Sequence, residues 1–204
     1  MEAPAGSLSG FGSTGLIRMA HWFEYFPVEP GDFVVDIGSC IGDTVLYYSR
    51  KVGKNGAVVA MEPEINNYST MCKLFFKYNC SNVIPIFAGI AKETGKTYLN
   101  IGGWNAHSTT FNPQYLQGKR MVPVISWDDL VEALNIPHVN LCKINAEGAE
   151  IEFLEGMSNI LPKKIALDEH SRFNVDINRL LQLLDAKGYK IVHRHENLIY
   201  AELT

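Results

Sequence analysis

Residues 31–43 read GDFVVDIGSCIGD, and this stretch decides how the rest of the chain is interpreted. Residues 33–37 form a short, almost continuous apolar run, which is typical of a β-strand buried on both faces. A turn containing Gly38 and Gly42 follows, and a helical stretch runs from there over residues 44–52. The order of strand, glycine turn and helix indicates the first βα unit of an α/β protein.

The same alternation of strand and helix continues along the chain. Further strands are expected at residues 57–61, 83–87, 141–145, 164–168, 189–192 and 198–203, and further helices at residues 65–78, 149–156 and 176–187. Pro85 favours an edge position for its strand. The pattern predicts a doubly wound α/β fold: a mainly parallel seven-stranded sheet, with helices on both faces and a C-terminal antiparallel hairpin.

Residues 95–125 interrupt this order. Residues 96–101 and 121–125 are expected to form an antiparallel pair around a polar insertion at residues 102–120, and a long loop of this kind is often a lid. Ser126 is expected to begin a helix, with Asp129 completing an imperfect capping box.

The N-terminal region is expected to form a flexible arm at residues 1–15 and a short helix at residues 16–27, ended by Pro27. No internal repeat or linker is evident in the 204 residues, so we expect a single domain, 1–204.

The composition excludes several classes of protein. Lys plus Arg is 18 and Asp plus Glu is 22, so the net charge is 18 − 22 = −4, which argues against binding nucleic acid by charge alone. An NPP[YF] motif, as found in nucleic-acid methylation, is also absent. No apolar run of about 18 residues predicts a membrane span, and the first residues do not resemble a secretory signal.

The four cysteines are scattered and form no CxxC pair, so neither a zinc site nor a disulfide scaffold is expected. Reduced thiols in a cytoplasmic protein are the simplest interpretation. The cysteines are Cys40, Cys72, Cys80 and Cys142.

The first βα turn predicts a ligand site, because open α/β sheets bind ligands beyond the carboxyl ends of their strands. The turn reads G-x-x-x-G and lacks the middle glycine of a dinucleotide fingerprint. Asp36 precedes it, and a carboxylate there would attract a cation and repel a phosphate. S-adenosylmethionine, with its ammonium and sulfonium groups, fits this requirement. Glu62, 24 residues after Gly38, is placed to accept hydrogen bonds from ribose, unless it is a solvated loop carboxylate.

Four segments together resemble the FkbM-type family of S-adenosylmethionine-dependent methyltransferases. They are DIGSCIGD (36–43), MEPE (61–64), KINAEGAE (143–150) and ALDEH (166–170). The resemblance implies a Rossmann-like class I methyltransferase fold and methyl transfer, usually to a hydroxyl of a sugar or another small metabolite. Its cofactor residues would be Asp36, Gly38, Ser39, Cys40, Gly42, Glu62, Pro63, Ala88 and Gly89.

Methylation of an alcohol requires a base for the departing proton. The candidates at the strand ends are Glu147, Asp168, Glu169 and His170, of which His170 has the most suitable unperturbed pKa. If the strand extends as far as His170, alternation places Asp168 and His170 on one side and Glu169 on the other. Glu147 begins a helix and could instead be a structural cap. A metal site formed by Asn145, Asp168 and His170 is conceivable but not expected.

One residue departs from the family pattern. The family has Asp where this chain has Asn145, and an amide can neither accept a proton at neutral pH nor supply a carboxylate to a metal. If that Asp is the catalytic group, this protein is altered or inactive. We assign Asn145 to the substrate site together with Trp104, Asn105 and His107 of the insertion, since aromatic and amide groups suit a sugar-like acceptor.

The sequence therefore predicts an O-methyltransferase that uses S-adenosylmethionine on a hydroxyl of a small metabolite or glycan. One alternative is an S-adenosylmethionine-binding module that has lost catalysis. Another is a nicotinamide-dependent oxidoreductase, which the missing glycine and the short chain disfavour. No nucleic acid and no membrane span are expected, and the hairpin or the N-terminal helix could form a homodimer contact.

Overall fold

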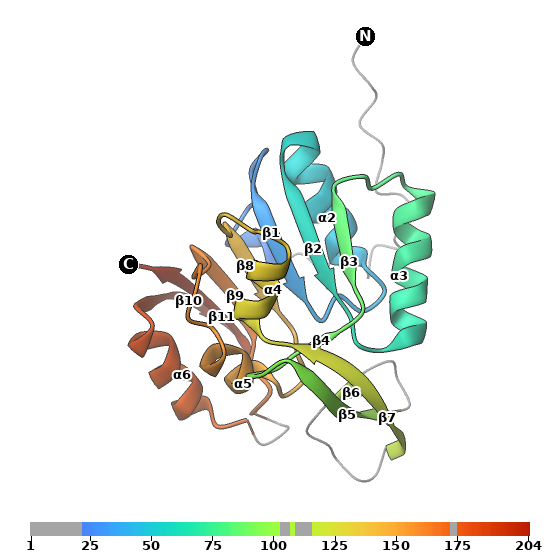
Figure 1. Cartoon of the computed structure of the whole chain (residues 1–204). Helices are drawn as coiled ribbons and strands as arrows, with labels where there is room; N and C mark the ends of the chain where they lie inside the picture. The colour runs from blue at the N-terminus through green and yellow to red at the C-terminus, as the bar shows by residue number, and fades with distance from the viewer. Residues whose placement is uncertain (1–21, 103–106, 109–115, 172–174) are drawn as a thin grey trace.

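The computed structural model describes residues 22–102, 107–108, 116–171 and 175–204 (Figure 1). The expected arm, the first half of the expected N-terminal helix (residues 16–21) and most of the polar insertion lie outside these residues.

A seven-stranded sheet with the order β10-β11-β9-β8-β1-β2-β3 forms the centre of the molecule. Its strands are β1 (Phe33–Ile37), β2 (Ala57–Met61), β3 (Val83–Ile86), β8 (Leu141–Ile144), β9 (Lys164–Asp168), β10 (Tyr189–His195) and β11 (Leu198–Leu203). Strands β3, β2, β1, β8 and β9 are parallel, and β11 is antiparallel to both of its neighbours. This confirms the doubly wound sheet with a C-terminal hairpin. Strand β3 is at the edge, as Pro85 predicts.

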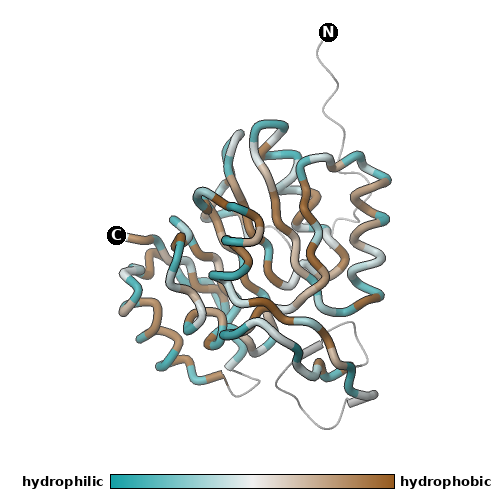
Figure 2. The backbone as a smooth tube through the Cα atoms, viewed as in Figure 1, coloured by the Kyte–Doolittle hydropathy of each residue, from teal (hydrophilic) through white to brown (hydrophobic). Residues whose placement is uncertain are grey.

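Helices cover both faces of this sheet, as expected (Figure 1). One face packs against α2 (Asp43–Val52) and α3 (Ile65–Lys77), and the other packs against α4 (Trp127–Ala133), α5 (Glu150–Glu155) and α6 (Ile177–Ala186). Successive strand residues alternate between the two cores, so Val34 faces α2 and Val35 faces α5. This double burial explains the continuous apolar runs of the central strands (Figure 2).

Near the polar insertion the chain forms a second, four-stranded sheet, of which the sequence predicts only one antiparallel pair. Its four strands, in the order β4-β7-β5-β6, are β4 (Gly89–Ile90), β7 (Leu116–Ile125), β5 (Gly95–Gly102) and β6 (His107–Ser108). The expected antiparallel pair is confirmed as β5 and β7. The two-residue strand β4 pairs with β7 in parallel, over too short a length for a sequence signal.

The start of α4 shows how the imperfect capping box works. The side chain of Ser126 accepts a hydrogen bond of 3.1 Å from the N–H of Asp129. The N–H of Ser126 donates to the hydroxyl of Thr94, which in turn donates to the carboxylate of Asp129. Thr94 therefore completes the box, because the side chain of Asp129 is too short to close it alone.

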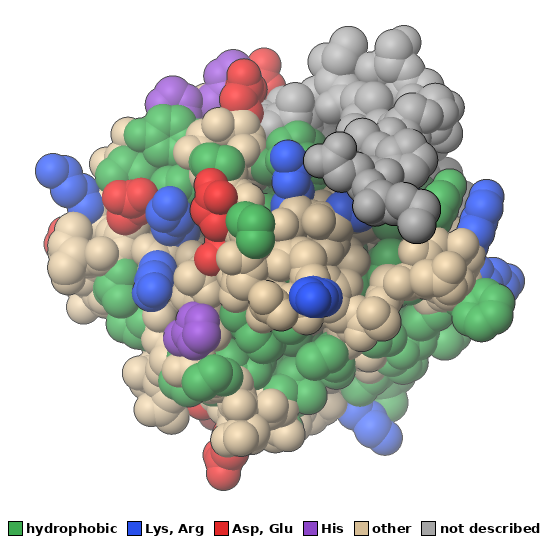
Figure 3. Space-filling model, turned by 90° about the horizontal axis from the view of Figure 1, so that it is seen from above, with side chains coloured by type: hydrophobic (Ala, Val, Ile, Leu, Met, Phe, Trp, Pro, Cys, Tyr) green, Lys and Arg blue, Asp and Glu red, His purple; other side chains and the backbone are tan. Residues whose placement is uncertain are grey.

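The face of the molecule drawn in Figure 3 has no single charge character. Acidic and basic side chains are interspersed on the face in Figure 3, in keeping with the small net charge. Within the described ranges, the longest apolar helical stretches fall short of what is needed to cross a bilayer. All four cysteines are free thiols.

Phe153 of α5 tests the packing between the helices and the sheet. Its side chain is 0% exposed and meets Trp127 edge-to-face, with 5.5 Å between ring centroids. Phe153→Ala should lower the free energy of unfolding by about 3–5 kcal/mol in urea titrations. The matched control is Phe76→Ala, because Phe76 is 88% exposed, and it should cost less than about 0.5 kcal/mol. Equal effects of the two substitutions would contradict the assigned core.

Candidate functional site

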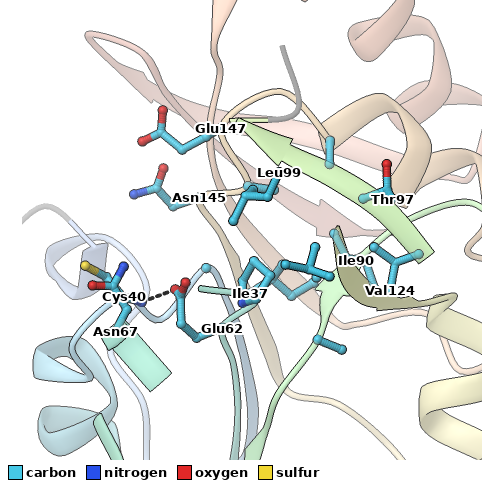
Figure 4. Close-up of a pocket in the computed structure, with 17 residues that line it drawn as sticks. Ile37, Cys40, Glu62, Asn67, Ile90, Thr97, Leu99, Val124, Asn145 and Glu147 are labelled. Atoms are coloured by element: carbon cyan, nitrogen blue, oxygen red, sulfur yellow. Dashed lines mark hydrogen bonds between the residues drawn. The ribbon is translucent and has the colours of Figure 1, made fainter. Parts of the chain in front are cut away.

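A pocket of about 230 Å³ lies at the carboxyl ends of β1, β2 and β8 (Figure 4). The second sheet closes one side of it with the inward-facing residues of β5 and β7, which are Thr97, Leu99, Val122 and Val124. The position agrees with the expected ligand site of an open α/β sheet.

The glycine turn brings two backbones into close contact at the pocket. Gly38 has a φ of 74°, and a Cβ added there would lie 2.0 Å from the backbone oxygen of Asn145. Gly42 has a φ of 86°, and a Cβ there would lie 2.8 Å from Cγ of Met71. Only glycine satisfies both the positive φ and the spacing at these two positions.

Glu62 is the carboxylate at the wall of the pocket. Its side chain accepts hydrogen bonds of 2.8 Å from the N–H of Cys40 and 2.8 Å from the N–H of Glu64. Burial raises the pKa of Glu62 to about 7, although the hydrogen bonds of Glu64, Cys40 and Asn67 act in the opposite direction. A carboxylate has room for further donors, so its remaining lone pairs can accept ligand hydroxyls.

Next to Glu62, Glu64 joins the second sheet to the helix that starts at the pocket. Its carboxylate caps α3 by accepting from the N–H groups of Asn66 and Asn67. The same carboxylate lies 2.6 Å from Nη1 of Arg120 in β7.

Asp36 does not face the pocket, contrary to the expectation from its place before the turn. Its side chain is 0% exposed, and its two oxygens bind Nζ of Lys143 at 2.8 Å and the hydroxyl of Thr44 at 2.6 Å. This carboxylate is buried and already paired, so it does not attract a ligand cation directly.

Of the nine cofactor residues named from sequence, six line the pocket. These are Gly38, Cys40, Glu62, Pro63, Ala88 and Gly89, whereas Asp36, Ser39 and Gly42 do not line it. Ser39 instead donates its hydroxyl to the backbone oxygen of Asp36 at 2.9 Å. Of the acceptor residues, Trp104 and Asn105 lie outside the described residues, and of His107 only the backbone, in β6, is described.

Asn145 and Glu147 follow β8 and line the same end of the pocket (Figure 4). The side-chain oxygen of Asn145 is buried and has no hydrogen-bond partner among the described residues. A buried acceptor of this kind carries a desolvation cost of about 1–3 kcal/mol until a donor reaches it. Glu147 has a φ of 50°, a backbone conformation that clusters at functional sites.

His170 lies behind Glu147 in a cluster of carboxylates. Its Nδ1 is 2.7 Å from Glu150, and its Nε2 is 3.5 Å from Glu147 and 3.8 Å from Asp168. Burial alone would lower the pKa of His170, but hydrogen bonds and charge from Glu147 and Glu150 outweigh it and raise that pKa to about 10.

The assignment of His170 as a base rests on its unperturbed pKa. The raised pKa does not favour that role, since a protonated imidazole has no lone pair to accept a proton. Strand β9 ends at Asp168, so the expected strand alternation does not extend to His170. His170 nevertheless lies 3.8 Å from Asp168, while Glu169 accepts from the N–H of Ser171. Within the described residues, no three His, Cys, Asp or Glu side chains are arranged to hold a metal ion.

Sequence reasoning missed two kinds of site residue. Lys143 and Asn67 contact Asp36 and Glu62 respectively, and a lysine inside the buried strand LCKI was a usable signal for the first. Alternate residues of β5 and β7 line the pocket. The local sequence does not show which of the two faces of these strands lies toward the pocket.

Comparison with known proteins gives a consistent result. A family model described as the methyltransferase FkbM domain matches residues 36–191, well over half of the chain. The hexuronic acid methyltransferase AglP of Haloferax volcanii is 29% identical over 133 residues, which are 65% of this chain and 53% of that protein. The chain thus spans about half the length of this relative.

Solved structures agree in fold. The structure of methyltransferase FkbM from Methylobacillus flagellatus superposes with a TM-score of 0.63 at 18% identity, covering 87% of this chain and 45% of that one. A SAM-dependent methyltransferase from Aquifex aeolicus gives a TM-score of 0.53 at 13% identity, covering 95% and 100%. The fold is that of class I methyltransferases, and with the family match over residues 36–191 the protein belongs to the FkbM methyltransferase family.

Proposed function

We propose that the protein transfers a methyl group from S-adenosylmethionine to a hydroxyl of a small metabolite or glycan. The observation that carries this proposal is the carboxylate of Glu62, held by the N–H groups of Cys40 and Glu64 at the wall of a pocket beside the glycine turn. Such a carboxylate is suited to the two hydroxyls of a ribose.

The remaining walls fit the other parts of the cofactor. Pro63, Ala88 and Ile90 offer an apolar slot beside Glu62 for a purine ring. The buried oxygen of Asn145 is an acceptor for an ammonium or hydroxyl donor of a bound ligand. Because Gly38 has no Cβ, the turn can pack directly against the backbone at the end of β8.

When bound, S-adenosylmethionine supplies a methyl group already activated by its sulfonium. The protein then has to hold the acceptor in line and remove one proton. We assign the base to Glu147, which lines the pocket and lies 3.5 Å from His170. The charged imidazole of His170 holds the Glu147 carboxylate in place and stays charged at neutral pH, because its pKa is raised to about 10. The named activity of the relative AglP, on hexuronic acid, supports a sugar-like acceptor.

A second candidate is a binding module that holds the cofactor without transferring the methyl group. Asn145 favours it, because the family pattern has Asp at this position. Binding without transfer to any member of a panel of sugars and hexuronic acids would favour this candidate. Restored transfer in Asn145→Asp would then attribute the loss to that residue.

Thermal-shift titrations with S-adenosylmethionine, S-adenosylhomocysteine and NAD test the proposed cofactor. A ligand at 100 times its Kd should stabilise the protein by about 2.7 kcal/mol, and we expect this for the two sulfur nucleotides and not for NAD. Glu62→Gln should weaken binding at least tenfold, whereas Glu152→Gln, at an exposed position, should leave binding unchanged. A shift with NAD alone would contradict the proposal.

The pH dependence of binding follows from the Glu62 carboxylate. Ribose hydroxyls donate to its ionised form, so binding favours loss of a proton. Because the pKa of Glu62 is about 7 in the free protein, calorimetry should show a Kd for S-adenosylhomocysteine that rises as the pH falls from 8 to 6. The Glu62→Gln variant should lose this dependence. If Kd depended on pH equally in the variant and the wild type, the proton would belong to a group other than Glu62.

Glu147→Gln tests the assignment of the base. With an acceptor that the wild type methylates, the kcat of this variant should fall by about 10²–10⁴-fold, because the amide cannot take up the proton. Kd for S-adenosylhomocysteine should change less than about threefold, since the fold and the ribose contacts remain. Product formation is followed as S-adenosylhomocysteine release, and wild-type kcat in this variant would contradict the assignment.

His170→Gln tests the charge of the buried imidazole through stability. Because the folded-state pKa of His170 is about 10 against an ordinary 6.5, its contribution is complete below pH 6.5 and is lost as the pH rises through 10. In urea titrations the wild type should exceed His170→Gln most at pH 6, and the difference should shrink toward pH 10.5. His138→Gln, at an exposed position, is the control. A difference independent of pH would show that His170 is neutral.

A further inference from the structure

Lys143 is a charged residue in the centre of the sheet. It lies in β8 directly beside Asp36 of β1 in the strand register, and its side chain is only 3% exposed. Lysine is rarely buried to this extent unless it is paired. The proposed chemistry leaves Lys143 without a role.

The contacts of Lys143 converge under the glycine turn. Its Nζ donates to Oδ1 of Asp36 at 2.8 Å and to the backbone oxygen of Gly38 at 2.8 Å. The ring of Trp22 lies over the same nitrogen, 5.1 Å from the ring centroid. An ammonium group has three N–H donors. Two of them make these hydrogen bonds, and the Trp22 ring adds a cation–π contact.

We propose that Lys143 is a positioning residue for the cofactor turn. Its ammonium group binds both the Asp36 carboxylate and the carbonyl of Gly38. These two contacts fix the conformation of the turn that brings the N–H of Cys40 to Glu62. The proposal rests on the proposed function, because the turn is taken as part of the S-adenosylmethionine site.

The bonds beyond Lys143 show how the effect reaches the pocket. The other oxygen of Asp36 accepts from Thr44 in the first turn of α2, so strand, turn and helix share one ion pair. The N–H groups of Gly38 and Ser39 donate to the backbone oxygen of Met61 at 3.0 and 2.9 Å. The turn is therefore held by β2 on one side of β1 and by β8 on the other.

If the ion pair of Lys143 and Asp36 has only a structural role, substitutions should give one result; if Lys143 positions the turn, they should give another. Replacing both members of a buried pair by neutral residues of similar size is often neutral or stabilising, because both desolvation costs disappear. If the role is structural, a neutral pair should restore both stability and ligand binding. If Lys143 positions the turn, a neutral pair should not restore ligand binding, because the carbonyl of Gly38 would still lack its donor.

The experiment compares Lys143→Met with the double variant Lys143→Met/Asp36→Asn. The single variant should be destabilised, since it leaves the Asp36 carboxylate buried without its cation. The double variant should recover a Tm close to wild type. Its Kd for S-adenosylhomocysteine should nevertheless stay at least tenfold weaker by calorimetry.

Lys164→Met is the matched control, because Lys164 also covers an aromatic ring and faces a carboxylate. Its Nζ lies 5.1 Å from the ring centroid of Phe26 and 4.0 Å from Glu202. It belongs to β9 and does not touch the turn, so Kd should be unchanged.

Amide hydrogen exchange supplies a readout that needs no ligand. In the double variant, residues 38–42 should exchange faster than in the wild type, while β1 and β8 stay protected. Wild-type Kd and wild-type exchange in a double variant of normal Tm would overturn the proposal. If the wild type binds no S-adenosylhomocysteine, the proposed function fails, and the exchange of residues 38–42 alone decides whether Lys143 positions the turn.

Discussion

The contact between the backbone of Gly38 and the carbonyl of Asn145 is the constraint on which the site depends. A Cβ at Gly38 would lie 2.0 Å from that oxygen, so the first βα turn and the end of β8 can meet only through a glycine. This contact places Cys40 within reach of Glu62, and it places Asn145 and Glu147 on the opposite wall of the same pocket. The tight turn at this wall of the pocket thus depends on the missing side chain of Gly38.

Much of the fold could be predicted from local patterns. The central strands are apolar because both faces are buried, and Pro85 marks the edge strand because it has no N–H to donate to a further strand. Glycine positions and the MEPE segment likewise located the pocket. These features depend on residues close in the sequence, which a pattern can show.

What could not be predicted depends on partners far apart in the chain. The orientation of Asp36 is set by Lys143, 107 residues away. The pKa of His170 is set by Glu147 and Glu150, which belong to a different βα unit. The second sheet requires the two-residue strand β4 to find β7. In each case the residue type was informative, but its electrostatic or pairing partner was not visible along the sequence.

The link between Glu64 and Arg120 also bears on the order of folding. Glu64 caps α3, while Arg120 belongs to β7, 56 residues later. A chain that has formed only its first two βα units therefore has neither the far wall of the pocket nor the partner of its capping carboxylate. Loop closure over such separations is slow compared with local helix formation. Binding competence is consequently a property of the completed fold, and a ligand in this pocket would select the fully folded molecules from a population still maturing.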